Sequence, residues 1–276
     1  MLRILNLGAG VQSTVVYLMA LKGEISIDCA IFSDLGEEPE SVYKHLEWLR
    51  SLNGAPIHTT SIGRLGDHLI QGTNSTGQKF ASIPAFTAAV EGERGGRVRR
   101  QCTAEYKIAP VEKFIRRTLL GLEKGERIPV NQRVAQLFGI SLDEAGRAFR
   151  IRANAPSWSD PEFPLIDRNM TRKDCVKWLL DYGVPHEVPR SACVFCPFKT
   201  DSEWLRLREY DPKGWARAVE VDTALRAAGV VLNRNTDESL YIHRSCTPLA
   251  EAHLCDDDKG QLGFQFEAEC EGGCGL

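Results

Sequence analysis

The sequence contains no long hydrophobic run, no pronounced excess of one charge and no common phosphate-binding signature. No stretch reaches the roughly 18 consecutive apolar residues of a membrane-spanning helix, so we expect no membrane association. Arg3 and Asn6 interrupt the apolar run near the N-terminus, which argues against a signal peptide and favours the cytoplasm. The net charge of −3 provides no general attraction to nucleic acid, so binding of nucleic acid requires a local basic patch.

Cysteine, by contrast, is plentiful: the 276 residues include nine of them. An odd number of cysteines in a chain with no secretion signal is atypical of a disulfide framework and favours metal or redox chemistry. The hydrophobic content of 43% and the charged content of 26% are typical of a soluble globular protein. The length fits one large domain or a domain with an appendage.

The first candidate site is the turn that comes after the N-terminal apolar run. Residues 2–7 suit a buried strand, and residues 11–23 suit a helix. Between them, Gly8, Ala9 and Gly10 leave backbone N–H groups free at the positive end of the helix, where phosphate binds. The turn has neither the lysine of a Walker loop nor the full spacing of a dinucleotide fingerprint. A simple tight turn of an α/β protein is the alternative interpretation.

A second candidate site lies in the next apolar run, residues 27–36, which we expect to be a buried strand. Ser33 and Asp34 stand at its end, followed by Gly36 and a helical pattern over residues 41–52. A carboxylate at the C-terminal end of such a strand is suited to bind a ribose or a phosphate-bound Mg²⁺. The alternative is that Asp34 only caps the following helix.

Arginines gather in residues 91–102, EGERGGRVRRQC, just before Cys102. This segment predicts an anion-binding loop, with a solvated surface loop as the alternative. The arginines concerned are Arg94, Arg97, Arg99 and Arg100.

Cys193 and Cys196 form a CxxC motif that is followed by Pro197. Two residues between the cysteines let both thiolates reach one metal across a turn. With Cys102 and Cys246 as further ligands, the set suits a [4Fe–4S] cluster, or zinc in its place, and unmetallated thiols are the third possibility.

We expect residues 121–160 to be a helical insertion in a domain that covers residues 1–200. A helix that is capped by Thr171 and Asp174 comes after the insertion. Residues 201–276 predict a helical to irregular C-terminal region. Its glycine-rich end carries two cysteines, Cys270 and Cys274, as candidate redox or nucleophilic thiols.

Five segments resemble, in order, the PP-loop (adenine nucleotide alpha hydrolase-like) superfamily, and most closely its phosphoadenosine phosphosulfate reductase-like family. The turn at residues 8–14, GAGVQST, is similar to the S-G-G-x-D-S-T loop, and FSDLGEEPESVY is similar to F-x-D-T-G-x-x-F-P-E-T. Cys102, Thr103, Lys107 and Pro110 match C-T-x-x-x-K-x-x-P. The resembling segments are residues 2–16, 30–43, 100–113, 164–183 and 191–198.

Two departures from the family patterns bear on function. Gln12 replaces the usual aspartate of the loop, as it does in the sulfonucleotide reductases. Thr103 stands where the adenylylsulfate reductases have a second cluster-binding cysteine.

The resemblance implies a Rossmann-like (HUP-type) α/β fold, with a parallel sheet flanked by helices and a mostly helical C-terminal region. It also implies a catalytic role for Lys107 and an anion-binding role for Arg172. The nucleotide-binding residues that it implies are Leu7, Gly8, Ala9, Gly10, Gln12, Ser13, Thr14, Ser33, Asp34 and Gly36.

Three functions are consistent with this resemblance. The first is an ATP pyrophosphatase with Mg²⁺ that activates a nucleic acid or a small anion for sulfur transfer from the cluster. The second is an adenylyl sulfate or phosphoadenylyl sulfate reductase whose nucleophile is Cys270 or Cys274. The third is a non-catalytic, nucleotide-binding Fe–S subunit of a modification or defence complex. A sulfur donor or a thioredoxin-like reductant is the expected protein partner, and a homodimer is the candidate assembly.

Overall fold

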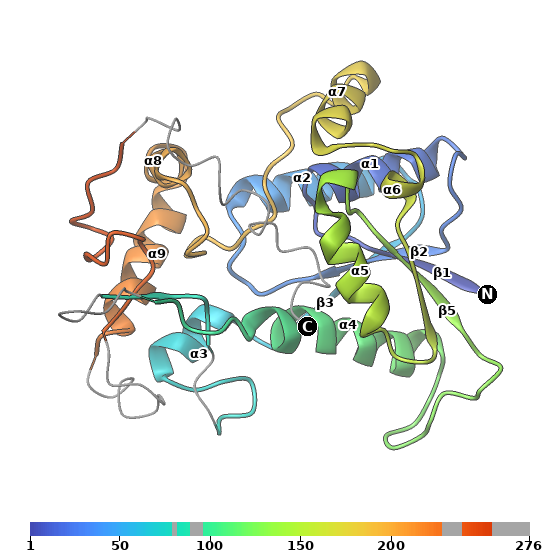
Figure 1. Ribbon diagram of the computed structural model, residues 1–276, viewed down its shortest axis with the longest axis horizontal. Helices are drawn as coiled ribbons and strands as arrows, with labels where there is room; N and C mark the ends of the chain where they lie inside the picture. Colours follow the sequence, from blue (N-terminus) through green and yellow to red (C-terminus); the bar gives the residue numbers. More distant parts are fainter. Residues whose placement is uncertain (79–81, 89–95, 228–238, 256–276) are drawn as a thin grey trace.

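A five-stranded, all-parallel sheet flanked by helices forms one part of the protein, and a smaller group of helices adjoins it (Figure 1). The computed structural model describes residues 1–78, 82–88, 96–227 and 239–255. The strands are β1 (Leu2–Asn6), β2 (Cys29–Ser33), β3 (Ile57–Thr60), β4 (Phe86–Thr87), β5 (Val134–Phe138), β6 (Ser159–Glu162) and β7 (Leu240–Tyr241). The α-helices are α1 (Val11–Leu21), α2 (Glu40–Ser51), α3 (Leu65–Gln71), α4 (Ala109–Phe114), α5 (Ala145–Ala153), α6 (Pro164–Asp167), α7 (Arg172–Tyr182), α8 (Asp201–Tyr210) and α9 (Pro212–Ala224). Short π-helical turns η1 (Ala104–Ile108) and η2 (Ile115–Leu119) flank α4, and a 3₁₀ turn η3 (Leu142–Glu144) precedes α5.

The strand order of the sheet is β3-β2-β1-β5-β6, so the chain leaves β1 in one direction and later returns to its other side. Leu5 of β1 pairs with Ala30 of β2 and with Leu137 of β5. In such a sheet a ligand binds at the C-terminal strand ends, at the point where the strand order reverses. Here that point lies between β1 and β5. The expected Rossmann-like α/β fold is confirmed.

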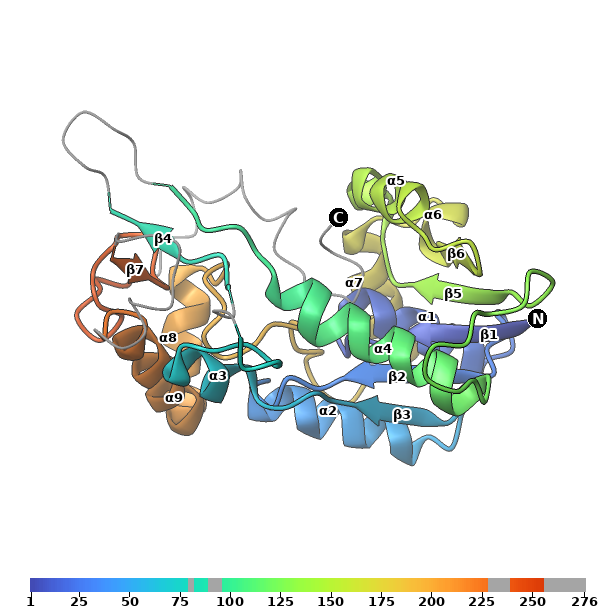
Figure 2. The ribbon, with the colours of Figure 1, turned by 90° about the horizontal axis from the view of Figure 1, so that it is seen from below.

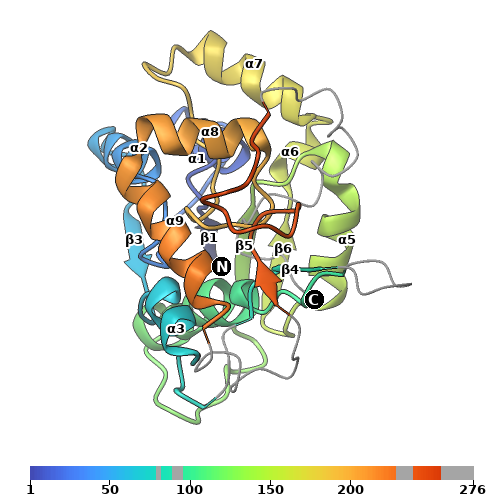
Figure 3. The same cartoon turned by 90° about the vertical axis from the view of Figure 1, so that its left-hand side faces the viewer.

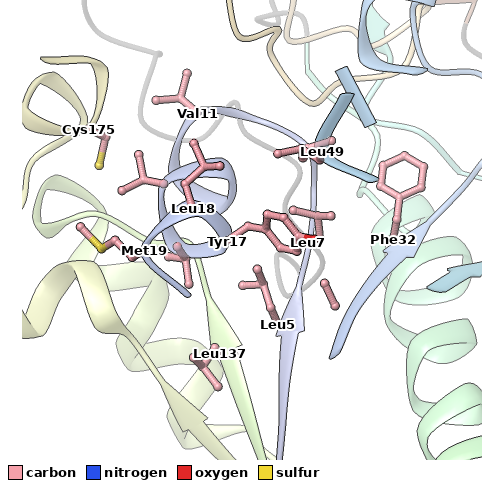
Figure 4. Packing of buried hydrophobic residues seen from close by; sticks show 14 of the residues in the cluster. Leu5, Leu7, Val11, Tyr17, Leu18, Met19, Phe32, Leu49, Leu137 and Cys175 are labelled. Atoms are coloured by element: carbon pink, nitrogen blue, oxygen red, sulfur yellow. The ribbon is translucent and has the colours of Figure 1, made fainter. Parts of the chain in front are cut away.

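Alternate residues of the strands serve two separate cores, because successive side chains point to opposite faces of a sheet. Leu5, Leu7 and Leu137 pack with Tyr17 and Leu18 of α1, as Figure 4 shows. On the other face, Ile4 and Ile31 pack with residues of α4 and η2. Figure 1 shows α1, α2 and α7 on one side of the sheet and α4 on the other.

The smaller group of elements comprises α3, α8, α9 and the short antiparallel pair β4–β7 (Figures 2 and 3). Its core is centred on Trp204, which is fully buried, and includes Leu65, Leu69 and Val221. Phe195, in the middle of the CxxC motif, belongs to the same core and is also fully buried. The CxxC turn is therefore anchored to the helical group.

The prediction that residues 121–160 form a helical insertion is wrong, because two strands of the sheet begin in this region. Val134–Phe138 is the buried strand β5 beside β1, and Ser159–Glu162 is the strand β6. The run VAQLF has apolar residues that fit both periodicities, and its burial on both faces favours a strand. Among the described residues of this region, only α5 and the turn η3 are helical.

The expected capped start of the helix after residue 170 is confirmed. Thr171 and Asp174 form a complete capping box at the start of α7, in which each side chain bonds the other residue's backbone N–H. Cys175 is fully buried in the core. Within the described residues, the structure contains no helix of the length and apolar character needed to cross a membrane.

Candidate functional site

The turn between β1 and α1 lies at the point where the strand order reverses. Ala9 adopts a left-handed conformation with φ of 57°, and Gly10 is extended at the helix N-cap. No side chain in the described part of the chain caps α1, and its first turn contains no acidic residue. An uncapped helix start favours negative charge, so phosphate binding at this turn stays a prediction with which the geometry is consistent.

Gly139, the residue after β5, lies in close contact with the backbone at the beginning of α1. A Cβ atom at this position would lie 2.5 Å from the backbone nitrogen of Ser13 and 2.8 Å from the carbonyl carbon of Gln12. Glycine is required here by the close approach of two backbones, since its φ is not in the left-handed region. The end of β5 thus fixes the position of the first turn of α1.

Gln12 is buried, and both the nitrogen and the oxygen of its side-chain amide form hydrogen bonds. Its Nε2 donates to Glu144 Oε2 at 2.8 Å, and its Oε1 accepts from Arg172 Nη1 at 2.9 Å. Glu144 also pairs with Arg147 through its other oxygen. An aspartate at position 12 has no N–H group to donate to Glu144, so the network accounts for glutamine here.

The side chain of Thr14 forms a hydrogen bond with His45 of α2. Its Oγ1 lies 2.9 Å from His45 Nε2, and His45 Nδ1 lies 2.7 Å from His186 Nε2. Burial, with a contribution from His186, lowers the pKa of His45 to about 3, so this ring is neutral near pH 7. The ring of Trp48 stacks on His45 and meets His186 edge-on. The predicted nucleotide-binding residue Thr14 is therefore held by the buried His45, which in turn contacts the exposed His186.

The residues predicted at the end of β2 form a tight turn. Ser33 Oγ donates to the carbonyl of Tyr106 at 2.8 Å. Asp34 Oδ1 accepts from the N–H of Gly36 at 2.7 Å and from the Tyr43 hydroxyl at 2.8 Å. Burial, together with the hydrogen bond to Asp34, raises the pKa of Tyr43. Asp34 thus stabilises the turn after β2.

Lys107 of η1 reaches the same strand ends from the opposite face of the sheet. It lines a small cavity together with Leu7, Gly8 and Ser33. Its Nζ lies 3.3 Å from Glu38 Oε1, and both side chains are almost fully buried. The structure therefore brings the predicted catalytic lysine next to the glycine turn.

Cys193 and Cys196 lie together, with a hydrogen bond between their thiols. The hydrogen bond from Cys193 lowers the pKa of Cys196 to about 6 despite burial, and Arg190 and the backbone of Phe198 add to this effect. The pKa of Cys193 is raised by the same hydrogen bond, by burial and by the charges of Cys196 and Glu38. The two thiols of the motif are therefore unequal.

The four thiols predicted as metal ligands do not come together. Cys102 packs in the same core as Cys193 and contributes to its raised pKa. Cys246 instead donates to the carbonyl of Thr87 at 3.4 Å. Among residues 1–78, 82–88, 96–227 and 239–255, no three His, Cys, Asp or Glu side chains are grouped so that they could hold a metal ion. Within the described residues the predicted ligand set is therefore not assembled, and the [4Fe–4S] cluster or zinc ion stays a prediction.

The predicted anion-binding arginines occupy two places. Arg97 and Arg100 lie over the ring of Phe198, with guanidinium carbons 5.3 and 5.7 Å from the ring centroid. Arg99 is exposed, and its carbonyl accepts from Ser82. Arg172 lies instead at the glycine turn, where it donates a hydrogen bond to Gln12. Three further predicted residues, Arg94, Cys270 and Cys274, lie outside the described residues.

A groove of about 630 Å³ opens beside the glycine turn, between α2, α7 and α8. Val11, the first residue of α1, forms part of its wall, together with Arg172 and His186. The wall of the groove contains both cations and carboxylates, among them the ion pair of Arg206 and Glu187. The groove gives solvent access close to the start of α1.

Scans of the chain against protein-family models, curated proteins and solved structures found no match. The resemblance to the PP-loop superfamily therefore stays a prediction that rests on the five segments.

Four residues of the site were missed by sequence reasoning: Glu38, His45, Gly139 and Glu144. Gly139 and Glu144 were missed because β5 was interpreted as a helix, although a glycine directly after a short apolar run is a strand-end signal. Glu38 and His45 carry no local signal, since their roles depend on residues distant in sequence.

Proposed function

We propose that the protein is a PP-loop enzyme that binds ATP at the turn of residues 8–10 and activates an anionic acceptor for sulfur transfer. The uncapped start of α1 supports binding of the phosphates, because its N–H groups and dipole favour negative charge. The location between β1 and β5 supports binding of a nucleotide.

The single observation that carries this proposal is the connection from the glycine turn to the thiols. Lys107 lines a cavity with Gly8 and pairs with Glu38. The neighbouring Glu37 accepts, at its carbonyl, a hydrogen bond of 2.7 Å from the N–H of Val194 in the CxxC motif. The glycine turn and the CxxC turn are thus both connected to the segment of Glu37 and Glu38, which supports a reaction that joins adenylation to sulfur chemistry.

The reaction is derived from the chemistry of adenylation. An oxygen of the acceptor attacks the α-phosphorus of ATP, the bond to the β-phosphate breaks, and pyrophosphate leaves. A sulfur nucleophile then displaces AMP from the activated acceptor. Lys107 and the N–H groups at the start of α1 stabilise the negative charge that develops on the phosphates. Mg²⁺ bound with ATP supplies further neutralisation of the departing pyrophosphate.

Arg97 and Arg100 support an anionic acceptor. They extend over Phe198, two residues after Cys196, so positive charge lies beside the thiol pair. Guanidinium groups bind phosphate and carboxylate through paired hydrogen bonds. A nucleic acid or a small anion is therefore the substrate class that we propose.

The test uses Arg172→Gln, with Arg168→Gln as the matched control. Arg172 holds Gln12 at the turn, whereas Arg168 bonds the carbonyls of Pro164 and Glu24. We expect Arg172→Gln to weaken ATP binding about 10-fold in calorimetric titration, as loss of one charged hydrogen bond predicts, and the control to bind normally. Equal ATP affinity in the two variants would contradict a nucleotide site at this turn.

Turnover is measured as pyrophosphate release from ATP in the presence of total RNA or of small sulfur-acceptor anions. Release that depends on an acceptor supports the enzyme. ATP binding without release of pyrophosphate under any of these conditions contradicts catalysis and leaves a nucleotide-binding subunit.

A second candidate function is reduction of adenylyl sulfate or its 3′-phosphorylated form. The glutamine at position 12 favours this second function, since the sulfonucleotide reductases resemble this chain at that position. The amide of Gln12 forms hydrogen bonds with Glu144 and with Arg172. A parallel titration with adenylyl sulfate separates the two functions. Binding of adenylyl sulfate in strong preference to ATP favours the reductase.

A further inference from the structure

The groove between α2, α7 and α8 is large enough for a small organic molecule. Its volume of about 630 Å³ is typical of a ligand-binding cleft, and Val11, the first residue of α1, belongs to its wall together with Arg172. Arg172 donates to Gln12 Oε1 at 2.9 Å, so this part of the wall adjoins the glycine turn. A molecule in the groove would therefore lie next to the phosphates of a nucleotide bound at the turn.

The same wall is also bonded to the segment that follows the CxxC motif. Arg190 donates to the carbonyl of Phe198 at 3.2 Å and forms an ion pair with Glu203. Lys199 lines the groove as well, and its backbone N–H donates to the carbonyl of Cys196 at 3.1 Å. One groove is thus lined by residues bonded to the glycine turn and by residues bonded to the CxxC segment.

One face of α7 carries a cation followed by exposed apolar side chains. Arg172, Val176 and Leu180 are spaced four residues apart, so they share a face of the helix, and all three line the groove. Val176 is 42% exposed and Leu180 is 75% exposed. At the helical rise of about 1.5 Å per residue, the stripe that they form is about 12 Å long. Tyr210 of α8, which is 73% exposed, adds a further apolar surface to the wall.

The charge of the wall is nearly balanced. Among the described residues that line the groove, five are lysines or arginines and four are aspartates or glutamates. Glu187 pairs with Arg206 at 2.7 Å, and Glu40 pairs with Lys44 at 2.8 Å. A nucleic acid backbone gains little from such a wall, because the carboxylates repel its phosphates. A molecule with a single negative charge and an apolar body fits both the charge and the apolar stripe.

We infer that this groove binds the acceptor, and that the acceptor is a small carboxylic acid with an apolar chain. Its carboxylate lies at Arg172, and its chain lies along Val176 and Leu180. Guanidinium groups bind carboxylates through paired hydrogen bonds, and exposed apolar side chains gain free energy when they are covered. The inference rests on the proposed function and narrows the anionic acceptor to one chemical class.

The reaction of such an acceptor balances without a redox step. A carboxylate oxygen attacks the α-phosphorus of ATP, the bond to the bridging oxygen breaks, and pyrophosphate leaves with the electron pair. The product is an acyl adenylate. The sulfur of a hydrosulfide or a thiol then attacks the carbonyl carbon and expels AMP, while the proton of that nucleophile passes to water. The acid becomes a thiocarboxylate or a thioester.

Binding of the acid is measured by calorimetric titration of the full chain in the absence of ATP. The probes are acetate, butyrate, hexanoate and octanoate, with octanamide as the uncharged control. We expect the affinity to rise about threefold for each added methylene group, and octanoate to bind about 10-fold more tightly than octanamide. An affinity that does not change along the series, or equal binding of octanoate and octanamide, would overturn the assigned ligand class.

Leu180→Gln tests the location of the apolar chain, and Phe149→Gln is the matched control. Phe149 of α5 is a helical side chain with a similar exposed fraction, 74%, but it is not part of the wall of the groove. Exposed positions of this kind tolerate glutamine with little loss of stability. We expect Leu180→Gln to bind octanoate about fivefold more weakly and the control to bind it as the wild type does. Equal affinity of the two variants would contradict the assignment to the groove.

Arg172→Gln tests the location of the carboxylate. We expect this variant to lose most of the preference for octanoate over octanamide, because its guanidinium is the assigned partner of the carboxylate. Arg168→Gln again serves as the control and is expected to keep the preference. An unchanged preference in Arg172→Gln would refute the role of Arg172.

Adenylation is tested with hydroxylamine, which converts an acyl adenylate into a hydroxamate and AMP. The full chain is incubated with Mg²⁺, ATP, octanoate and hydroxylamine, and we expect octanohydroxamate to be detected by mass spectrometry. Binding of both ATP and octanoate without formation of hydroxamate would contradict the role of the acid as acceptor. Failure of octanoate to bind while ATP binds overturns this inference alone, whereas failure of ATP to bind while octanoate binds overturns the proposed function.

Discussion

Substitution of Gly139 by alanine tests whether the end of β5 positions the glycine turn. The added Cβ would stand 2.5 Å from Ser13 N and 2.6 Å from Ser13 Cα, while ordinary contact begins at 3.4 Å. The atoms that it meets are backbone atoms of α1, which cannot move aside by a change of rotamer. Either β5 or the start of α1 must shift by about 1 Å.

The expected cost depends on the rigidity of both elements. β5 is paired on both sides in the sheet, and the first turn of α1 is fully buried. Overpacking of this kind costs about 2–3 kcal/mol of the free energy of unfolding. For a chain of this size that loss corresponds to a melting temperature lower by about 8 °C.

The assay is urea denaturation followed by circular dichroism, with Gly146→Ala as the control. Gly146 lies in α5, and its nearest neighbour is a side-chain nitrogen of Arg150 at 3.9 Å. Alanine there is expected to be neutral or to stabilise the protein by about 0.5–1 kcal/mol. If Gly139→Ala unfolds at the same urea concentration as the wild type, the close approach of β5 to α1 is wrong.

Two further predictions concern stability. The folded-state pKa of His45, about 3, lies below the ordinary value of 6.5, so the unfolded chain binds an extra proton between these pH values. The free energy of unfolding therefore decreases as the pH is lowered through this window, by about 2 kcal/mol from pH 7 to pH 5 through this residue. His45→Gln is expected to lose that part of the pH dependence in urea titrations at the two pH values, and an unchanged slope would refute the assignment. Thr171→Ala removes the capping box of α7 and is expected to cost about 1 kcal/mol by the same method, whereas no change in midpoint would mean that the cap contributes nothing.

Local patterns in the sequence were sufficient where neighbours along the chain decide the structure. The apolar run before Gly8 predicts β1, and the small residues after it predict a turn into α1. The capping box at Thr171 is visible in the sequence because both of its members lie within one helical turn. The CxxC spacing likewise predicts that Cys193 and Cys196 meet.

The same reasoning failed at β5, because its five residues are buried on both faces. A short run such as VAQLF has no polar alternation to mark a strand, and the helical residues after Gly139 extend the apolar pattern. The misassignment concealed the close approach of Gly139 to α1 and the bond from Gln12 to Glu144.

The sequence by itself determined the reactive residue types, their order and those elements whose signals are local, such as β1, the turn after it, the capped start of α7 and the CxxC motif. Only the tertiary structure decided which of them meet. It paired Lys107 with Glu38, joined the CxxC turn to Glu37 through the N–H of Val194, and held Cys246 against Thr87. These contacts depend on strand order and on the packing of the helical group, and the free energy of packing is a property of the whole chain that no local pattern encodes.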